Sequence, residues 1–267
     1  NPWLVYGTDN STNTGFQPLP DACEGTPVAI SDATPTNGIC GIAGSIAVSW
    51  TGGSANYLIS WTDGTNSGSE SGIAVQTYTI QNLAAGTYNI TVPDNYGSTD
   101  EITGIVVNYL PVTLNHGAGT SYYANIQTAI DAAVEGDEVH ICAGTFVENN
   151  FGWTGLRVQN KSIKLIGAGS DQTTVKIGNL TNGIEFQGDI SVWVEGITFT
   201  RDVATGPGFF IRLGEVASTY SSITLKNLVV EYAEGRNIML NQNGIYDGLM
   251  IENCIVRNSK FWGLSLN

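Results

Sequence analysis

Three short stretches toward the C-terminal end of the chain share one pattern of apolar and polar residues. They are WVEGITF at 193–199, TLKNLVV at 224–230 and MIENCIV at 250–256, so the pattern recurs 31 and then 26 residues later. In register, the stretches align Val194 with Leu225 and Ile251, which are all apolar. Repetition at a period of roughly 20–50 residues is typical of units that stack on one another. This feature therefore predicts stacked strands rather than hairpins.

Other columns of the same alignment agree with stacking. Two more columns are apolar, and their members are Ile197, Leu228 and Cys254, then Phe199, Val230 and Val256. The column of Gly196, Asn227 and Asn253 contains residue types that tolerate a left-handed backbone conformation. We therefore predict that the chain bends at this column and that the apolar columns form the interior of the stack.

A charged column lies between the apolar ones. Glu195, Lys226 and Glu252 would lie on adjacent strands about 4.8 Å apart, which places the two carboxylates about 9.6 Å apart. That separation is near the one used by inverting glycosidases. Because Lys226 lies between the carboxylates and would neutralise both, we interpret the column as a surface ion-pair ladder. Glu231 and Arg257 occupy equivalent positions in successive repeats and are interpreted as another such pair.

A second series of apolar stretches is interleaved with the first. It comprises GIEF from 183, GFFI from 208, NIML from 237 and GLSL from 263. Two interleaved series with one common period predict coils that carry strands on several faces, as in a right-handed parallel β-helix over residues 112–267. A helical pattern precedes them at 124–134, with its apolar stripe at Ile126, Ala129, Ile130, Ala133 and Val134. Because so short a helix is marginal alone, we predict that it caps the first coil.

Residues 26–110 show a period of two instead. Stretches such as SIAVSW, YLISW and TYNITV alternate between turn-rich segments. Five or more short strands over about 85 residues predict an immunoglobulin-like β-sandwich, so the chain is predicted to be all-β. The alternating aromatic residues are interpreted as sandwich core, with an exposed sugar-stacking row as the alternative. Residues 1–25 have no clear period and are predicted to form an N-terminal extended segment.

Charge is distributed unevenly along the chain. Residues 1–156 contain no Lys or Arg and 14 acidic residues, whereas residues 157–267 contain all ten Lys and Arg and ten acidic residues. An acidic half without cations disfavours nucleic acid and anionic membranes as partners. The sequence also has no apolar run of about 18 residues, so we expect no membrane insertion. Abundant Gly, at 33 residues, and only 13% charged residues suit an extracellular all-β protein.

The four cysteines fall into two groups. Cys23 and Cys40 are 17 residues apart in a segment rich in Pro, Gly and Thr. We predict a disulfide between them, and closing a loop of that size contributes about 3 kcal/mol. Cys142 and Cys254 lie within apolar strand patterns and are interpreted as core thiols.

One acidic turn is a candidate calcium site. The segment VPDNYGSTDE contains Asp94, Asn95, Asp100 and Glu101, and hard oxygen donors of this kind suit Ca²⁺. The alternative is an ordinary turn in which an Asp side chain binds nearby backbone. We assign no catalytic residue, because neither histidine has a Ser or Cys nucleophile pattern near it. Calcium is the one cofactor that the sequence suggests.

The N-terminal half resembles a known repeat. The segments GSIAVSWTGGSANYLISWTDG and YTIQNLAAGTYNITVPDNYG, within about 39–107, resemble the SprB-type repeat of large surface adhesins in gliding bacteria. Two residues depart from that family's pattern, because Asn56 replaces the usual Pro and Ser98 replaces the usual Cys. The resemblance therefore leaves Cys40 without its customary partner, which favours Cys23. It also implies export to the cell surface.

The C-terminal half resembles a second family. The segments IQTAIDAAVEGDEVHICAGTFVEN and KSIKLIGAGSDQTTVKIG are similar to the entry sequence of the pectin-lyase-like β-helix superfamily, over about 112–267. That resemblance implies a fold, but the superfamily includes lyases, hydrolases, phage spikes and adhesins. Its lyases hold calcium with carboxylates and use Arg or Lys as the base. No matching constellation is evident among the carboxylates of the predicted coils.

The sequence as a whole leads to one expected function and two alternatives. We expect a secreted or cell-surface structural or adhesive protein that binds a polysaccharide, a cell-surface glycan or a partner protein along the β-helix. The first alternative is a polysaccharide lyase or glycoside hydrolase with its site on later coils. The second is a filament subunit that self-associates through an open coil end, because FWGLSLN is an apolar strand with no cap after it.

Overall fold

The structure is a computed structural model that describes residues 25–178, 182–201, 208–214, 217–233 and 235–266. The extended segment predicted at 1–25 lies outside these residues apart from Gly25, and so does Cys23. The described chain forms two compact units, of which the first contains residues 25–32, 48–78 and 89–103 and the second contains 33–47, 79–88 and 104–266. No helix in the described ranges has the length and apolarity needed to cross a membrane.

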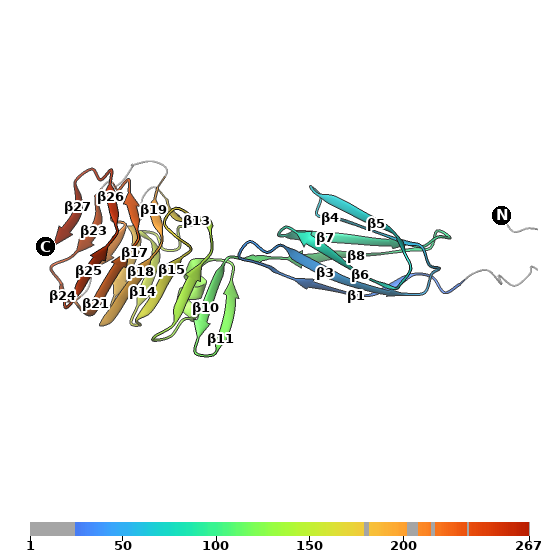
Figure 1. The fold of residues 1–267 in the computed structure, drawn as a ribbon, viewed down its shortest axis with the longest axis horizontal. Helices are drawn as coiled ribbons and strands as arrows, with labels where there is room; N and C mark the ends of the chain where they lie inside the picture. Colours follow the sequence, from blue (N-terminus) through green and yellow to red (C-terminus); the bar gives the residue numbers. More distant parts are fainter. Residues whose placement is uncertain (1–24, 179–181, 202–207, 215–216, 234, 267) are drawn as a thin grey trace, which may run out of the picture. The chain divides into compact units, whose positions relative to one another are not determined.

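Residues 138–265 form a parallel β-solenoid of about four turns (Figure 1). The first solenoid sheet contains β12 (Glu138–Ile141), β15 (Ile163–Gly167), β18 (Ile190–Glu195), β21 (Ser218–Lys226), β24 (Gly244–Tyr246) and β25 (Leu249–Glu252). The second contains β13 (Gly144–Glu148), β16 (Thr173–Ile177), β19 (Thr198–Thr200), β22 (Val229–Glu231) and β26 (Ile255–Arg257). The third contains β14 (Thr154–Gln159), β17 (Asn182–Gln187), β20 (Ile211–Leu213), β23 (Arg236–Leu240) and β27 (Trp262–Leu266).

The register of these strands confirms the predicted stacking. Val194 pairs with Leu225, which pairs with Ile251 on the next coil. Val194 and Leu225 are buried, whereas Ile251 is 38% exposed on the last described coil. The predicted bend is also confirmed, because the φ angles of Gly196, Asn227 and Asn253 are 68°, 52° and 50°. Gly and Asn adopt this left-handed conformation at low cost, so the same bend recurs in these three coils.

The predicted capping helix is present but shorter than expected. It is α1 (Ile126–Ala132), and the Asn125 side chain caps it by accepting a hydrogen bond from the Thr128 amide. Ile126 and Ile130 are buried, as predicted. Val134 is instead 49% exposed, because the helix ends before it. An antiparallel hairpin of β10 (Val112–His116) and β11 (Gly119–Tyr123) extends the first solenoid sheet beside β12.

One side chain of α1 completes the edge of the third solenoid sheet. The Gln127 Nε2 donates to the Arg157 carbonyl oxygen at 3.1 Å, and the Gln127 Oε1 accepts from the Arg157 amide at 2.9 Å. These two bonds replace those that a preceding coil would make to β14. The Lys161 ammonium donates to the carbonyl oxygens of Ile130 and Ala133 at the end of α1. The residues that resemble the superfamily's entry sequence thus build the cap.

Replacing Gln127 by alanine is expected to lower the free energy of unfolding by about 1–3 kcal/mol, because the Arg157 amide and carbonyl would lose their partners at a buried edge. Urea denaturation followed by circular dichroism measures the change. Val134→Ala is the matched control, because its side chain is exposed just after the same helix, and it should change stability by less than about 0.5 kcal/mol. Equal effects of the two substitutions would show that Gln127 does not support the edge.

Residues 29–107 form two further sheets. One has the order β1 (Ala29–Thr36), β3 (Gly44–Thr51), β6 (Thr77–Leu83), and the other has the order β5 (Ser67–Ile73), β4 (Tyr57–Thr62), β7 (Gly86–Pro93), β8 (Thr99–Val107). Trp50, Tyr57 and Tyr88 are buried, so their interpretation as core is confirmed. Trp61 differs, because it is only partly buried. The immunoglobulin-like sandwich remains a prediction for this region.

A disulfide joins Cys40 to Cys142, which corrects the predicted Cys23–Cys40 pair and the interpretation of Cys142 as a core thiol. Strand β2 (Gly38–Ile39) pairs with β9 (Tyr109–Leu110), and the Cys142 amide donates to the Pro111 carbonyl oxygen at 3.0 Å. Both cysteines are therefore held beside the segment 109–111, and their Cα atoms are 5.3 Å apart, a normal separation for a disulfide. Cys254 is free and partly buried, as predicted.

Candidate functional site

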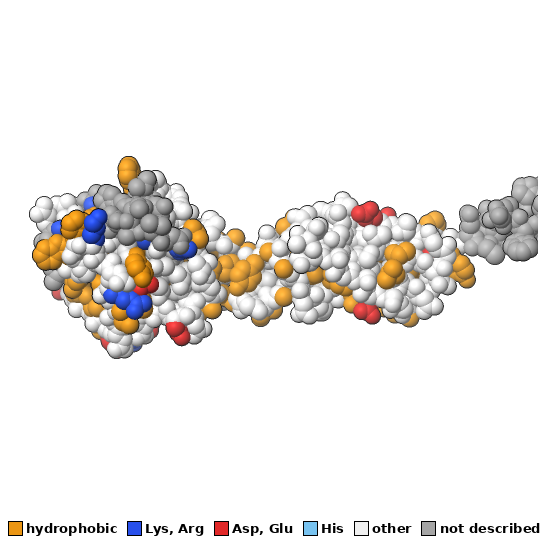
Figure 2. All heavy atoms as spheres, turned by 90° about the horizontal axis from the view of Figure 1, so that it is seen from above, with side chains coloured by type: hydrophobic (Ala, Val, Ile, Leu, Met, Phe, Trp, Pro, Cys, Tyr) orange, Lys and Arg blue, Asp and Glu red, His pale blue; other side chains and the backbone are white. Residues whose placement is uncertain are grey.

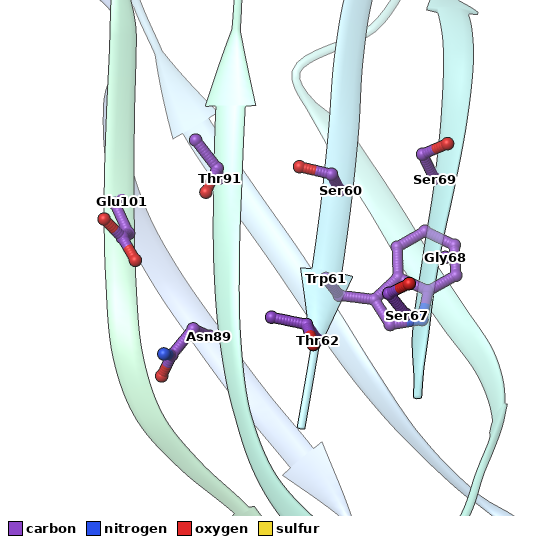
Figure 3. Close-up of a pocket in the computed structure, with 9 residues that line it drawn as sticks. All are labelled: Ser60, Trp61, Thr62, Ser67, Gly68, Ser69, Asn89, Thr91 and Glu101. Atoms are coloured by element: carbon purple, nitrogen blue, oxygen red, sulfur yellow. The ribbon is translucent and has the colours of Figure 1, made fainter. Parts of the chain in front are cut away.

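The four-stranded sheet β5–β4–β7–β8 has a polar depression of about 570 Å³ on one face (Figure 3). We call it the polar trough. Its lining residues come from all four strands and are Ser60, Trp61, Thr62, Ser67, Gly68, Ser69, Asn89, Thr91 and Glu101. Most of them carry hydroxyl or amide groups, so the trough is polar and almost uncharged.

Strand alternation and register place these groups side by side. On β4, Tyr57 and Ile59 are buried, so Ser60, which follows Ile59, points to the opposite face. Ser60 pairs with Ser69 on β5 and with Thr91 on β7. The next outward row joins Ser67, Thr62 and Asn89 in the same way. Neighbouring strands lie about 4.8 Å apart, so the trough presents two parallel rows of hydrogen-bonding groups.

The electrostatics of the trough are simple. Glu101 is its one ionisable carboxylate, and no residue from 1 to 156 is Lys or Arg. Figure 2 shows the basic side chains gathered on the solenoid instead. Hydroxyl and amide groups both donate and accept hydrogen bonds. The trough therefore suits a ligand that is rich in hydroxyl groups and carries no negative charge.

Two of the four residues predicted to bind calcium, Asp94 and Asp100, use their carboxylates to accept hydrogen bonds from backbone amides. The Asp94 Oδ1 accepts hydrogen bonds from the amides of Tyr96 and Ser98, both at 2.9 Å, and the Asp100 Oδ2 accepts from the Ile30 amide at 2.7 Å. The Asp94 contacts match the alternative interpretation, an ordinary Asp turn, whereas Asp100 holds a strand that is distant in sequence. The described ranges contain no group of three or more His, Cys, Asp or Glu residues that could hold a metal ion. Calcium binding at Asp94, Asn95, Asp100 and Glu101 thus stays a prediction.

The same contacts set the ionisation of Asp94. Partial desolvation acts to raise its pKa, but hydrogen bonds from the amides of Tyr96, Ser98 and Ser54 together bring the pKa below its usual value. A carboxyl with a lowered pKa stabilises the fold above its unfolded-state pKa and loses that contribution as the pH falls through its folded-state pKa. The turn after β7 is therefore held by an ionised Asp94 at neutral pH.

The charged columns of the solenoid form ion pairs, as interpreted. Lys226 pairs in register with Glu252, and their Nζ and Oε2 atoms are 3.8 Å apart. Glu195 instead accepts hydrogen bonds from the Trp193 indole at 3.1 Å and the Asn227 side chain at 3.3 Å. Arg257 Nε lies 2.6 Å from Glu231 Oε2, which confirms that pair. These groups stabilise the surface of the coils, so we base no catalytic proposal on them.

A buried charged cluster on the third solenoid sheet was not singled out from the sequence. Glu185 is 4% exposed and accepts hydrogen bonds from the side chains of Asn182 and Gln187. Arg157 and Arg212 flank it on the preceding and following coils, at 3.5 Å and 3.4 Å. Once the coil period is known, the register of these three residues is the signal that reveals the cluster. The three charged side chains therefore form a partly buried row of alternating charges on successive coils.

Several apolar side chains are exposed on the last described turns of the solenoid. They are Ile245, Leu249, Met250, Ile255, Phe261, Trp262 and Leu264. At the first turn, by contrast, α1 and Gln127 cover the edge of β14. Head-to-tail stacking of coils between copies would therefore require α1 to be displaced. Self-association through a coil end stays a prediction.

Comparisons with protein-family models, with curated proteins and with solved structures find no match to this chain. The similarity to the SprB-type repeat and to the pectin-lyase-like superfamily therefore depends on the motifs quoted above.

Proposed function

We propose that this chain belongs to a secreted or cell-surface adhesive protein that binds a glycan in the polar trough. The observation that carries the proposal is the trough itself, in which two rows of hydroxyl and amide groups from neighbouring strands line one concave surface. In this proposal the parallel β-solenoid, which resembles the right-handed pectin-lyase-like fold, is a stiff support. The Cys40–Cys142 disulfide supports an oxidising location outside the cytoplasm.

The chemistry of the trough supports a sugar better than other ligand classes. A sugar presents hydroxyl groups that both donate and accept hydrogen bonds. The side chains of Ser60, Thr91 and Asn89 can likewise donate and accept, so they complement such groups. The trough lacks the cations that a phosphate or nucleic acid requires. It also lacks a metal-ligand cluster and a nucleophile next to a base, so its residues favour binding rather than catalysis.

The double variant Ser60→Ala/Thr91→Ala is expected to weaken glycan binding about 10- to 100-fold, because two hydrogen bonds of about 0.5–1.5 kcal/mol each are lost. A glycan array first identifies a bound sugar, and isothermal titration calorimetry then gives the dissociation constants. Thr87→Ala is the matched control, because Thr87 is an exposed β7 residue outside the trough lining. Absence of glycan binding, or equal affinity of the double variant and the control, would refute the proposal.

A further inference from the structure

A second, smaller depression lies on the outer face of the first solenoid sheet. It has a volume of about 170 Å³, and we call it the indole depression. Its lining residues are Gly136, Ser162, Ile163, Lys164, Ser191, Val192, Trp193 and Ser222. Most of them belong to β15, β18 and β21, which are neighbouring strands of this sheet (Figure 1). The depression is therefore built by successive coils and is separate from the polar trough.

Alternation and register place an indole and serine hydroxyls on the same face. On β18, Val192 is buried, so its neighbours Ser191 and Trp193 both point to the outer face. Lys164 on β15 pairs with Trp193, and Ser222 on β21 pairs with Ser191. Paired residues of a parallel sheet share a face, so all four side chains surround the same depression.

A β-bulge adds another hydroxyl group beside the depression. Ile190 pairs with Tyr220 and Ser191 pairs with Ser222, so Ser221 is an extra residue on β21. Ser221 and Ser222 are both exposed, and the Ser221 Oγ lies 3.3 Å from the Ser191 Oγ. Bulges redirect side chains and are over-represented next to active sites. Here the bulge presents two serines of one coil opposite one serine of the preceding coil.

The Trp193 indole is held in position by charged neighbours. Its Nε1 donates a hydrogen bond to the Glu195 Oε2 at 3.1 Å, and the Lys164 Nζ lies 5.6 Å from the ring centroid. The Lys164 ammonium is itself paired with Glu138, at 2.7 Å. Because the indole N–H is already bonded, the partly buried ring and the methylene stem of Lys164 offer apolar contact.

We infer that the indole depression is a second binding site, which takes one pyranose ring of a neutral glycan. Apolar walls with a few hydroxyl groups suit a sugar, whose C–H groups pack on the Trp193 indole while its hydroxyl groups bond to Ser191 and Ser222. The ligand is neutral because Glu138 and Glu195 outnumber the one cation, Lys164, and would repel an acidic sugar. The inference does not depend on the polar trough, and it gives the solenoid a binding role of its own.

The test follows the indole N–H resonance of Trp193 in the ¹⁵N-labelled chain, assigned by its loss in Trp193→Phe. The probes are the methyl glycosides of glucose, mannose and galactose, with methyl glucuronide as the acidic probe. We expect at least one neutral glycoside to shift this resonance, with a dissociation constant in the millimolar range. Cyclohexanol, a ring of the same size with one hydroxyl group, should bind at least tenfold more weakly, because it cannot bond to several serines.

Two variants test the residues of the site. Trp193→Ala should weaken binding of the preferred glycoside about tenfold, as measured by saturation-transfer difference NMR. Ser222→Gln should also weaken it, because a longer side chain would enter the depression. Ser222 is exposed, so this variant keeps the test decisive if Trp193→Ala fails to fold. Trp153→Ala is the matched control, because Trp153 is 75% exposed and lies outside the depression.

Several outcomes would overturn the inference. A Trp193 resonance that no glycoside shifts would show that the depression is not a sugar site, and so would unchanged affinity in both Trp193→Ala and Ser222→Gln. Equal affinity for cyclohexanol would show a general apolar site, and a preference for methyl glucuronide would contradict the neutral assignment. Ser60→Ala/Thr91→Ala should leave the response of Trp193 unchanged, so failure of this site and failure of the polar trough are distinguished.

Discussion

Replacing Cys142 by serine is expected to lower the free energy of unfolding by about 3–5 kcal/mol, the largest effect of any single substitution that spares the apolar core. Cys40 and Cys142 are 102 residues apart, so their bond closes a long loop in the unfolded chain. Loop-closure entropy for about 100 residues corresponds to about 4.7 kcal/mol, compared with about 3 kcal/mol for the shorter Cys23–Cys40 loop. The bond also holds the segment before β3 against the end of β12.

Guanidinium denaturation of the unreduced chain, the reduced chain and Cys142→Ser measures this effect. Cys254→Ser serves as the control, because that thiol is unpaired and only partly buried. Mass spectrometry of peptides from the unreduced chain identifies the pairing directly. A linked peptide that contains Cys23 and Cys40 would show that the pairing expected from sequence spacing is the correct one. Equal stability with and without reductant would show that the disulfide does not contribute the expected free energy.

Replacing Phe199 by alanine is expected to cost about 3–5 kcal/mol, because the ring is buried in the middle of the solenoid core. Phe199 lies on β19 and pairs with Val175 on the preceding coil and with Val230 on the following coil. Since each coil of a solenoid is supported mainly by its neighbours, a cavity at this position weakens two coil interfaces together. We therefore expect the coils around β19 to open first.

Hydrogen exchange detects that local opening, and denaturation gives its free energy. The matched control is Thr200→Ala, the next residue on β19, whose partly exposed side chain faces away from the core and should contribute less than about 0.5 kcal/mol. Comparable losses for both variants, or uniform protection across the coils in Phe199→Ala, would contradict the role of Phe199.

The solenoid could be predicted because one repeat period determines which of many residues are buried. A slip of one position would move Val194 and Leu225 to the outer face, so burial specifies the register strongly. The bends were predictable for a similar reason, since a left-handed residue recurs at Gly196, Asn227 and Asn253. The charged column with Lys226 then followed from the register without further information.

Features that depend on contacts between distant segments could not be predicted in this way. The partner of Cys40 is determined by the pairing of β2 with β9 and by the contact of Cys142 with Pro111, and no local pattern reports either. Val134 continues the apolar spacing of α1, but the helix ends before it. The polar trough depends on the strand order β5–β4–β7–β8, in which β7 lies beside β4 although β5 and β6 separate them in the chain.

The pairing of Cys40 with Cys142 also imposes an order of events on biosynthesis. As the chain emerges from its N-terminal end, the thiols of Cys23 and Cys40 appear together, about 100 residues before Cys142. An early oxidant would therefore join the two near thiols first, and the bond found here would require thiol–disulfide exchange after the first coil has formed. Oxidation after the first coil has folded, or with an isomerase present, avoids this trap.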